Sequence, residues 1–118
     1  MDYKKEIYGL LKPITPKVDY FYPKDFKQLP CISYYIINDS TVLQLNNEEK
    51  IVNLAVQVDV WADANSSTSE LSEKIKAEFL KVGFIRGLNG DLVDPSGLNH
   101  KTMRFEAKID LRNNLVYQ

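Results

Sequence analysis

The residue with the clearest potential for chemistry is His100, the only histidine among the 118 residues. Catalysis by a histidine needs an orienting carboxylate and a nucleophile within reach of the imidazole. Asp91 and Asp94 are close to His100 in the sequence, but no pattern fixes their geometry relative to the ring. The residues just before His100, 97–99, are typical of a turn. We therefore predict a surface histidine in a loop and no active site.

The single cysteine and the acidic residues of the longest apolar stretch give equally weak indications of a site. Cys31 opens an apolar segment without a nearby histidine, so a buried structural thiol is the default. One cysteine allows neither an internal disulfide nor a thiolate metal cluster. Asp59 and Asp63 fall short of the dense oxygen ligation that calcium requires, so we expect solvent-facing charge there. We predict no catalytic residue, no cofactor and no metal.

Aromatic residues concentrate in two neighbouring segments, and few basic residues lie among them. The cluster consists of Tyr20, Phe21, Tyr22, Tyr34 and Tyr35. Stacking on nucleic-acid bases is normally accompanied by a basic groove, whereas the formal net charge here is -1. Core packing plus a subunit contact is the better prediction, because tyrosine is enriched in interfaces. A pocket for a small ligand or peptide, lined by these aromatic rings, stays open as an alternative.

Composition indicates one ordinary globular domain, with 44% apolar and 26% charged residues. No apolar run approaches the 18 or so residues of a membrane span. No secretory apolar segment follows the first residues, so we expect a protein that is made in the cytosol and has no membrane partner. The near-neutral charge also argues against general nucleic-acid recognition.

The strongest pattern lies in residues 51–82. Apolar and polar residues alternate from 51 to 61, which predicts a long strand with one face on a core. A polar linker follows, and Ser67 with Glu70 three places later predicts the start of a helix over 67–82. The helical stripe should comprise Leu71, Ile75, Phe79 and Val82, and Gly83 should end the helix.

The rest of the chain gives shorter predicted elements. These are a helix over 2–11, an edge strand over 18–22, a strand covered on both faces over 31–38, a hairpin over 38–50 with its tip near 46–49, turns over 87–91 and 94–97, a strand over 101–110 and a tail over 112–118. The predicted fold class is α+β. A mostly antiparallel sheet carries the main helix and the short N-terminal helix on one face, and the long hairpin projects from it.

The order of these features resembles the small tail-completion, or tail-to-head joining, proteins of long-tailed bacteriophages and prophages. The resemblance covers about residues 18–111. Its most specific parts are the sequence LPCISYY at 29–35 and the alternating strand that ends at Trp61 before a Ser/Thr-rich helix start. These are packing patterns, and the family has no active-site residues to carry over.

The resemblance implies a virion structural protein at the joint between head and tail. Members assemble with copies of themselves into a ring, commonly a hexamer, which caps the tail tube and joins it to the head connector. The partners implied are therefore a second copy, the tail-tube protein and the head–tail connector protein.

Three segments are the predicted ring contacts: the hairpin 38–50, the outer face of 31–38 and the turn 87–99. The candidate interface residues are Tyr35, Ile37, Val42, Leu43, Leu45, Asn46, Asn47, Glu48, Asp91 and Asp94. The competing functions are another phage part, such as a head-completion or minor tail protein, the ligand-binding module described above, and, as the weakest, an enzyme.

Overall fold

The computed structural model describes residues 2–64, 66–113 and 115–116. It has a mixed α+β fold, as predicted, with one sheet and two helices. The strands run in the order β1-β2-β3-β5-β4, and β6 pairs with the far end of β5. The elements are α1 (Tyr3–Leu11), β1 (Val18–Tyr20), β2 (Cys31–Leu45), β3 (Glu48–Ala62), α2 (Ser69–Lys81), β4 (Ile85–Val93), β5 (Asn99–Asp110) and β6 (Leu115–Val116).

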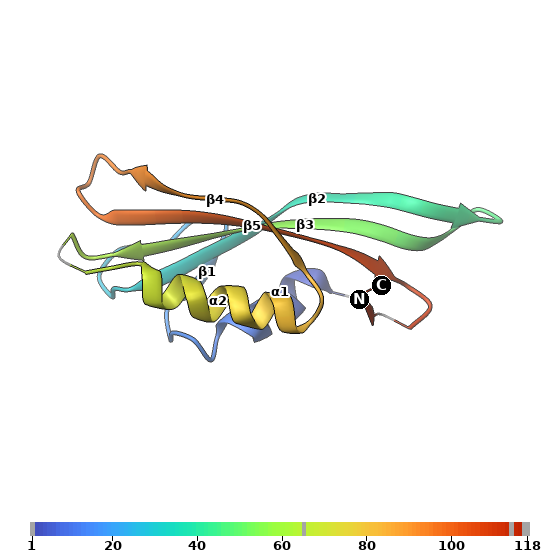
Figure 1. Cartoon of the computed structure of the whole chain (residues 1–118), viewed down its shortest axis with the longest axis horizontal. Coiled ribbons are helices and arrows are strands. Elements are labelled where there is room, and N and C mark those ends of the chain that lie inside the picture. Colours follow the sequence, from blue (N-terminus) through green and yellow to red (C-terminus); the bar gives the residue numbers. More distant parts are fainter. Residues whose placement is uncertain (1, 65, 114, 117–118) are drawn as a thin grey trace.

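Both helices cover the same face of the sheet, which we call the helix face; the other we call the open face (Figure 1). Ile7 and Leu11 of α1 and Ile75 and Phe79 of α2 pack into one buried cluster with the strands. The ring of Phe79 stacks on Phe105 of β5, with centroids 4.3 Å apart. The cluster therefore ties both helices to the centre of the sheet.

The central strand β3 has the predicted alternation. Its helix-face side chains, Val52, Leu54, Val56, Val58 and Val60, are all buried. It pairs with β2 from Glu48 to Trp61 and, on its other side, with β5 from Ile51 to Ala62. Because a strand hydrogen-bonded on both sides has no free edge, β3 holds the register of the sheet.

Helix α2 confirms the predicted element, but two details of the prediction were wrong. The helix begins at Ser69 after Thr68, and the Ser67 hydroxyl accepts from the Ser69 N–H in a local turn instead of forming a capping box. Val82 lies outside the buried stripe and is exposed. Gly83 has a φ of 96°, the left-handed conformation that ends many helices and favours glycine.

The segment 87–91 is a strand and not the predicted turn. It belongs to β4, which pairs with β5 from Ile85 to Val93 with a bulge between Arg86 and Asn89. Gly87 and Gly90 lie within this edge strand, and neither is crowded by its neighbours. The glycines therefore do not mark a turn here, although their presence predicted one.

The two ends of the chain follow the predictions in outline. Helix α1 begins after Asp2, whose carboxylate accepts from the Lys5 N–H. At the other end, part of the predicted tail is the short strand β6, which pairs with Ile109 and Asp110.

The predicted hairpin is present and gives the molecule its elongated shape. The principal extents are 54 × 25 × 23 Å, and the hairpin between β2 and β3 occupies one end of the long axis (Figure 1). Since the last pair between β3 and β5 is Ile51 with Asp110, the hairpin tip has no third strand beside it. We call residues 37–50 the arm.

Candidate subunit interface

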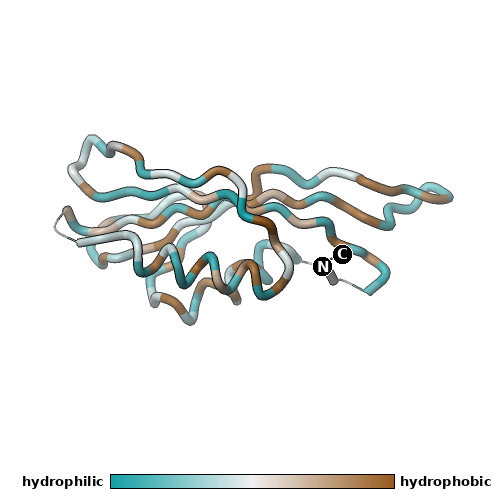
Figure 2. Tube along the Cα trace, in the orientation of Figure 1, coloured by the Kyte–Doolittle hydropathy of each residue, from teal (hydrophilic) through white to brown (hydrophobic). Residues whose placement is uncertain are grey.

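The arm exposes apolar side chains over its full length. Every residue from 37 to 49 is exposed. Four of the predicted interface residues, Ile37, Val42, Leu43 and Leu45, are apolar and between 37% and 53% exposed. Figure 2 shows that apolar positions recur along the arm almost to its tip. Exposed apolar residues in such a row are typical of a contact surface.

The prediction that residues 31–38 are covered on both faces holds only for the first half. Cys31, Ile32, Ser33 and Tyr34 are buried, whereas Ile37 is exposed. Strand β1 stops at Tyr20, opposite Tyr34, and the Tyr20 hydroxyl accepts from the Ile36 N–H. Beyond that point no other strand within the described residues pairs with the outer edge of β2.

The pairing of β2 with β3 shifts register at three places in the arm, and two of these are bulges on β2. Residues 37 and 42 have no opposite residue on β3, because the register shifts at Ile36/Asn38 and at Thr41/Leu43. Bulges bend an edge strand and protect it against uncontrolled pairing. The arm therefore offers side chains for contact more readily than a straight backbone edge.

Asn46 and Asn47 make the tip. Their φ values are 53° and 64°, and both residues lie between the paired ends of β2 and β3. A two-residue turn with both φ values positive matches the right-handed twist of the strands, and asparagine tolerates this conformation better than most residues. These two predicted interface residues thus have a structural role of their own.

The arm is acidic. It carries Asp39, Glu48 and Glu49 against the single base Lys50, whose ammonium group bonds Glu48 at 2.6 Å. This hydrogen bond, with the adjacent charge, lowers the pKa of Glu48. Burial raises the pKa of Tyr3 in α1, and the negative charges of Asp39 and Glu49 raise it further. The field of the arm is therefore negative on the side that faces α1.

Strand β4 forms the second exposed apolar surface. Ile85, Leu88 and Leu92 are 73%, 80% and 48% exposed, and we call these three residues the β4 strip. One edge of β4 pairs with β5, and no strand within the described residues pairs with the other. Arg86 lies within the strip, and Arg104 of β5 packs against Gly87 beside it. Arg104 is in turn ion-paired with Glu106 at 3.4 Å, so Arg86 is the basic residue that lies next to Ile85 without leaving β4.

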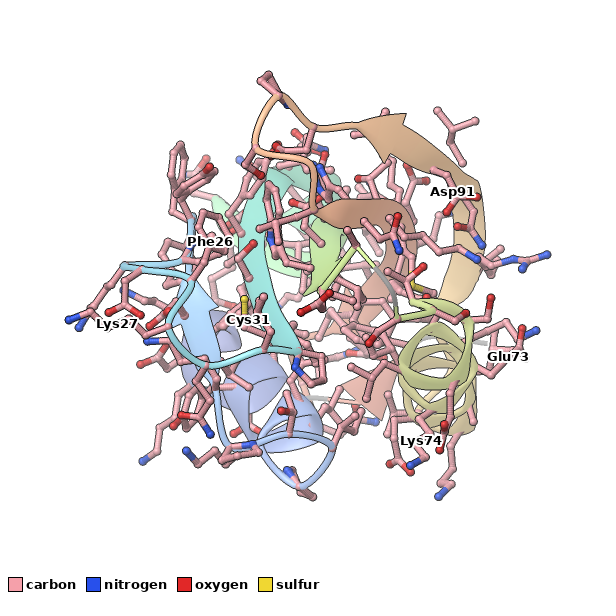
Figure 3. All side chains as sticks on the ribbon, turned by 90° about the vertical axis from the view of Figure 1, so that its left-hand side faces the viewer. Phe26, Lys27, Cys31, Glu73, Lys74 and Asp91 are labelled. Atoms are coloured by element: carbon pink, nitrogen blue, oxygen red, sulfur yellow. The ribbon has the colours of Figure 1, made fainter. Side chains whose placement is uncertain are left out.

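The remaining predicted residues do not lie with the arm. Asp91 is on β4 (Figure 3), and Asp94 lies in the β4–β5 turn, where its carboxylate accepts from the Ser96 N–H at 2.9 Å. Hydrogen bonds from Ser96 lower the pKa of Asp94. The end of β4 and the arm lie at opposite ends of the long axis (Figure 1). The predicted residues therefore do not form one continuous surface.

Tyr35 belongs to a third region, the open face near β2. Its ring contacts Phe21 at 5.2 Å, and Tyr22 and Phe26 both contact Trp61. In Figure 3 the loop that carries Phe26 lies over β2, and the neighbouring Lys27 extends away from the sheet. The loop covers only this part of the open face with its aromatic residues.

Sequence reasoning was wrong about His100 and Asp59. His100 lies in β5 and not in a loop; its ring stacks on Trp61 with centroids 3.6 Å apart. Its Nε2 atom is 3.0 Å from the carboxylate of Asp59, which is only 5% exposed instead of solvent-facing. The Gln57 amide donates to the same carboxylate. The register of β3 with β5 brings these side chains together. No local sequence pattern indicates that register.

The geometry does not make these residues a Ser-His-Asp triad. Ser33 of β2 is paired with Asp59 of β3, and His100 of β5 approaches Asp59 from the other side. The carboxylate therefore lies between the serine and the imidazole. In a triad the imidazole must lie between them to take the serine proton. The Ser33 hydroxyl instead accepts from the Trp61 indole at 3.1 Å. The cluster fastens β2, β3 and β5 together on the open face.

Cys31 matches its predicted structural role. It is fully buried, and burial, together with the negative charge of Asp19, raises the pKa of its thiol to about 11. The described residues contain no group of three or more histidine, cysteine or acidic residues that could hold a metal ion. None of the helices among them is both long and apolar enough to cross a membrane.

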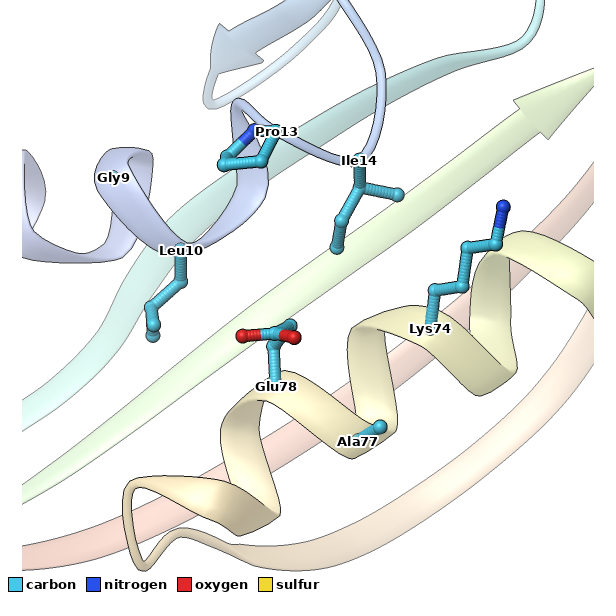
Figure 4. A pocket seen from close by; sticks show the side chains of 7 residues that line it. All are labelled: Gly9, Leu10, Pro13, Ile14, Lys74, Ala77 and Glu78. Carbon is cyan, nitrogen blue, oxygen red and sulfur yellow. The ribbon is translucent and has the colours of Figure 1, made fainter.

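Shallow cavities lie beside the helices, among them one of about 440 Å³ at the start of α2. Two others are lined partly by α1. One, of about 350 Å³, is between α1 and α2 and is lined by Leu10, Ile14, Lys74 and Glu78 among others (Figure 4). The other, of about 680 Å³, includes Tyr20 and Tyr34 of the predicted aromatic cluster. There the Lys4 ammonium group lies 4.1 Å from the centre of the Tyr20 ring. The Tyr34 hydroxyl donates to the Lys4 carbonyl, so these polar groups already bind one another.

The chain matches no protein-family model and no curated protein.

Proposed function

We propose that this chain is a virion structural subunit of a long-tailed phage or prophage, of the tail-completion type. Copies of it would form a ring, commonly a hexamer, which caps the tail tube and joins it to the head connector. The chain would then act at the head–tail joint by binding these proteins and not by catalysis.

One observation carries the proposal: the arm is an exposed, partly apolar extension that the core does not need. Its side chains from 37 to 49 are exposed, while the buried cluster is complete without them. Keeping apolar residues in water in a projecting hairpin is unfavourable for a monomer and favourable for a subunit that assembles. The elongated α+β fold and the resemblance at residues 29–35 and 51–61 support the same reading.

Deletion of residues 46–49 in the phage genome tests the proposal. The isolated variant should keep the folded core, because none of these residues belongs to the buried cluster or to the apolar side chains packed against it. Particles made with it should show filled heads beside unjoined tails, or tails of uncontrolled length, in electron micrographs. Infectious titre should fall by several orders of magnitude.

Asn47→Gly is the matched control, since it keeps the positive φ at the tip. Particles with this variant should be normal. Normal infectious particles from the deletion would contradict the proposal, and empty or leaking heads with complete tails would assign the chain to head completion instead.

A further inference from the structure

We propose that the arm of one copy docks on the β4 strip of the next copy, in a head-to-tail contact. The inference rests on the proposed function and names the partner of its interface: the arm binds another copy of this chain at β4, and the tube and connector bind elsewhere. A contact between two different surfaces of identical subunits is heterologous, and it produces a ring when the rotation closes.

The first support is that the two apolar surfaces match in length. The arm places its exposed apolar residues between Ile37 and Leu45, which are eight residues apart; at about 3.3 Å per residue, without the bulged residue at 42, this is roughly 23 Å. The strip runs from Ile85 to Leu92, or roughly 20 Å at the same rise with one bulged residue. Each surface is thus long enough to cover most of the other.

The second support is charge. The arm has three carboxylates and one lysine, and that lysine is bonded to Glu48. On β4, Arg86 lies between Ile85 and Leu88, and Asp91 follows further along the strand. The neighbouring Arg104 is ion-paired with Glu106 at 3.4 Å, so Arg86 is the cation that can complement the arm. Register places Asp39 opposite Leu54 and Arg86 opposite Phe105, both on the helix face of the sheet. A head-to-tail contact that keeps the helix faces together would therefore bring Asp39 to Arg86.

The third support is location. The arm occupies one end of the long axis and β4 the other half (Figure 1), in a molecule 54 Å long. A chain cannot fold its own arm onto its own strip, because β2 and β3 are paired from the arm through the core. Every copy therefore offers one donor surface and one acceptor surface, and each is covered only by a neighbour.

Site-directed cross-linking tests the contact. Val42→Cys on the arm and Leu88→Cys on the strip are prepared as separate proteins, concentrated to the millimolar range and mixed with a short bismaleimide. The native Cys31 is buried and should not react. A cross-linked dimer should form only in the mixture of the two variants.

Lys74→Cys is the matched control for Leu88→Cys, because Lys74 is exposed on α2 and away from β4 (Figure 3). Its mixture with Val42→Cys should give no dimer. Dimers from Leu88→Cys alone would mean that two β4 strands pair with each other and would overturn the inference. The absence of any dimer in the Val42→Cys and Leu88→Cys mixture would overturn it too.

Charge reversal gives a second readout. Arg86→Glu in the strip partner should lower the cross-linking yield by about two- to fivefold, the range expected for an exposed ion pair. Asp39→Arg in the arm partner should restore it. Equal yields in all combinations would contradict the proposed pairing. The proposed function is tested separately, by the particles made with the 46–49 deletion. If those tails stay unjoined but the cross-link does not form, only the docking of the arm on the strip is overturned.

Discussion

At the scale of single residues, burial in this sheet decides chemistry that composition leaves open. The same three residue types, cysteine, histidine and aspartate, occur in many active sites. Here Cys31 is sealed in the sheet, and Asp59 holds His100 against Trp61. Asp59 and His100 restrain each other, and the Cys31 thiol is kept from solvent by burial.

The thiol of Cys31 should be inert in the folded protein. Its pKa is raised from 9.0 to about 11, and only the thiolate reacts with disulfide reagents. We expect no reaction with Ellman's reagent at pH 8 and one equivalent after unfolding in urea. The raised pKa also means that the unfolded chain loses this proton first. Stability is therefore unaffected below pH 9 and should fall between pH 9 and about 11.

The pair of Asp59 and His100 should contribute to stability as a unit. Asp59→Ala removes the acceptor of both His100 and Gln57, and should cost about 1–3 kcal/mol because two half-buried side chains lose their partner. His100→Phe keeps an aromatic ring near Trp61 but loses the hydrogen bond. In a double-mutant cycle by urea unfolding, the two changes should couple by about 0.5–3 kcal/mol. Additive effects would mean that the stacking alone holds the cluster.

At the scale of elements, the predictable parts are those in which one local pattern dominates. The alternation of β3 and the stripe of α2 each repeat often enough to set the element type. In β4 the glycines outweighed a weak apolar pattern, so the sequence indicated a turn where pairing with β5 makes a strand. The arm was predictable because polar residues flank its apolar middle.

The arm residues could be predicted from the sequence and the Asp59–His100 cluster could not, because only the former are close together in the sequence. Arm residues are neighbours in the sequence, so they could be named together before the fold was known. Asp59 and His100 meet only because β3 pairs with β5 in one register. No local signal carries that register.

The turn at the tip of the arm gives a prediction at this scale. Asn47→Val places a β-branched residue at a φ of 64°, which should cost about 1–2 kcal/mol locally. We expect increased amide exchange in residues 41–50 by NMR and an unchanged melting temperature, because the tip unfolds without the core. A lowered melting temperature would show that the arm and the core unfold together.

At the scale of the whole molecule, stability is concentrated at one end. The buried cluster lies under the helices. Beyond the last pair of β3 with β5, Ile51 with Asp110, the described part of the arm consists only of its own two strands. Amide hydrogen exchange should therefore be slowest in residues 52–60, which are paired on both sides, and fastest in residues 43–50. Assembly should slow exchange selectively in the arm and in β4. Equal protection of arm and core in a free monomer would contradict this distribution.

Continuity of β2 and β3 from the arm into the core has a mechanical consequence. A pull along the strands loads many backbone hydrogen bonds at the same moment, in shear, and the load passes to β5 through its twelve pairs with β3. A sideways pull on the tip would instead open the hairpin one bond at a time. A subunit built this way resists tension along its length and yields to peeling, so the direction of force at a joint would decide whether it holds.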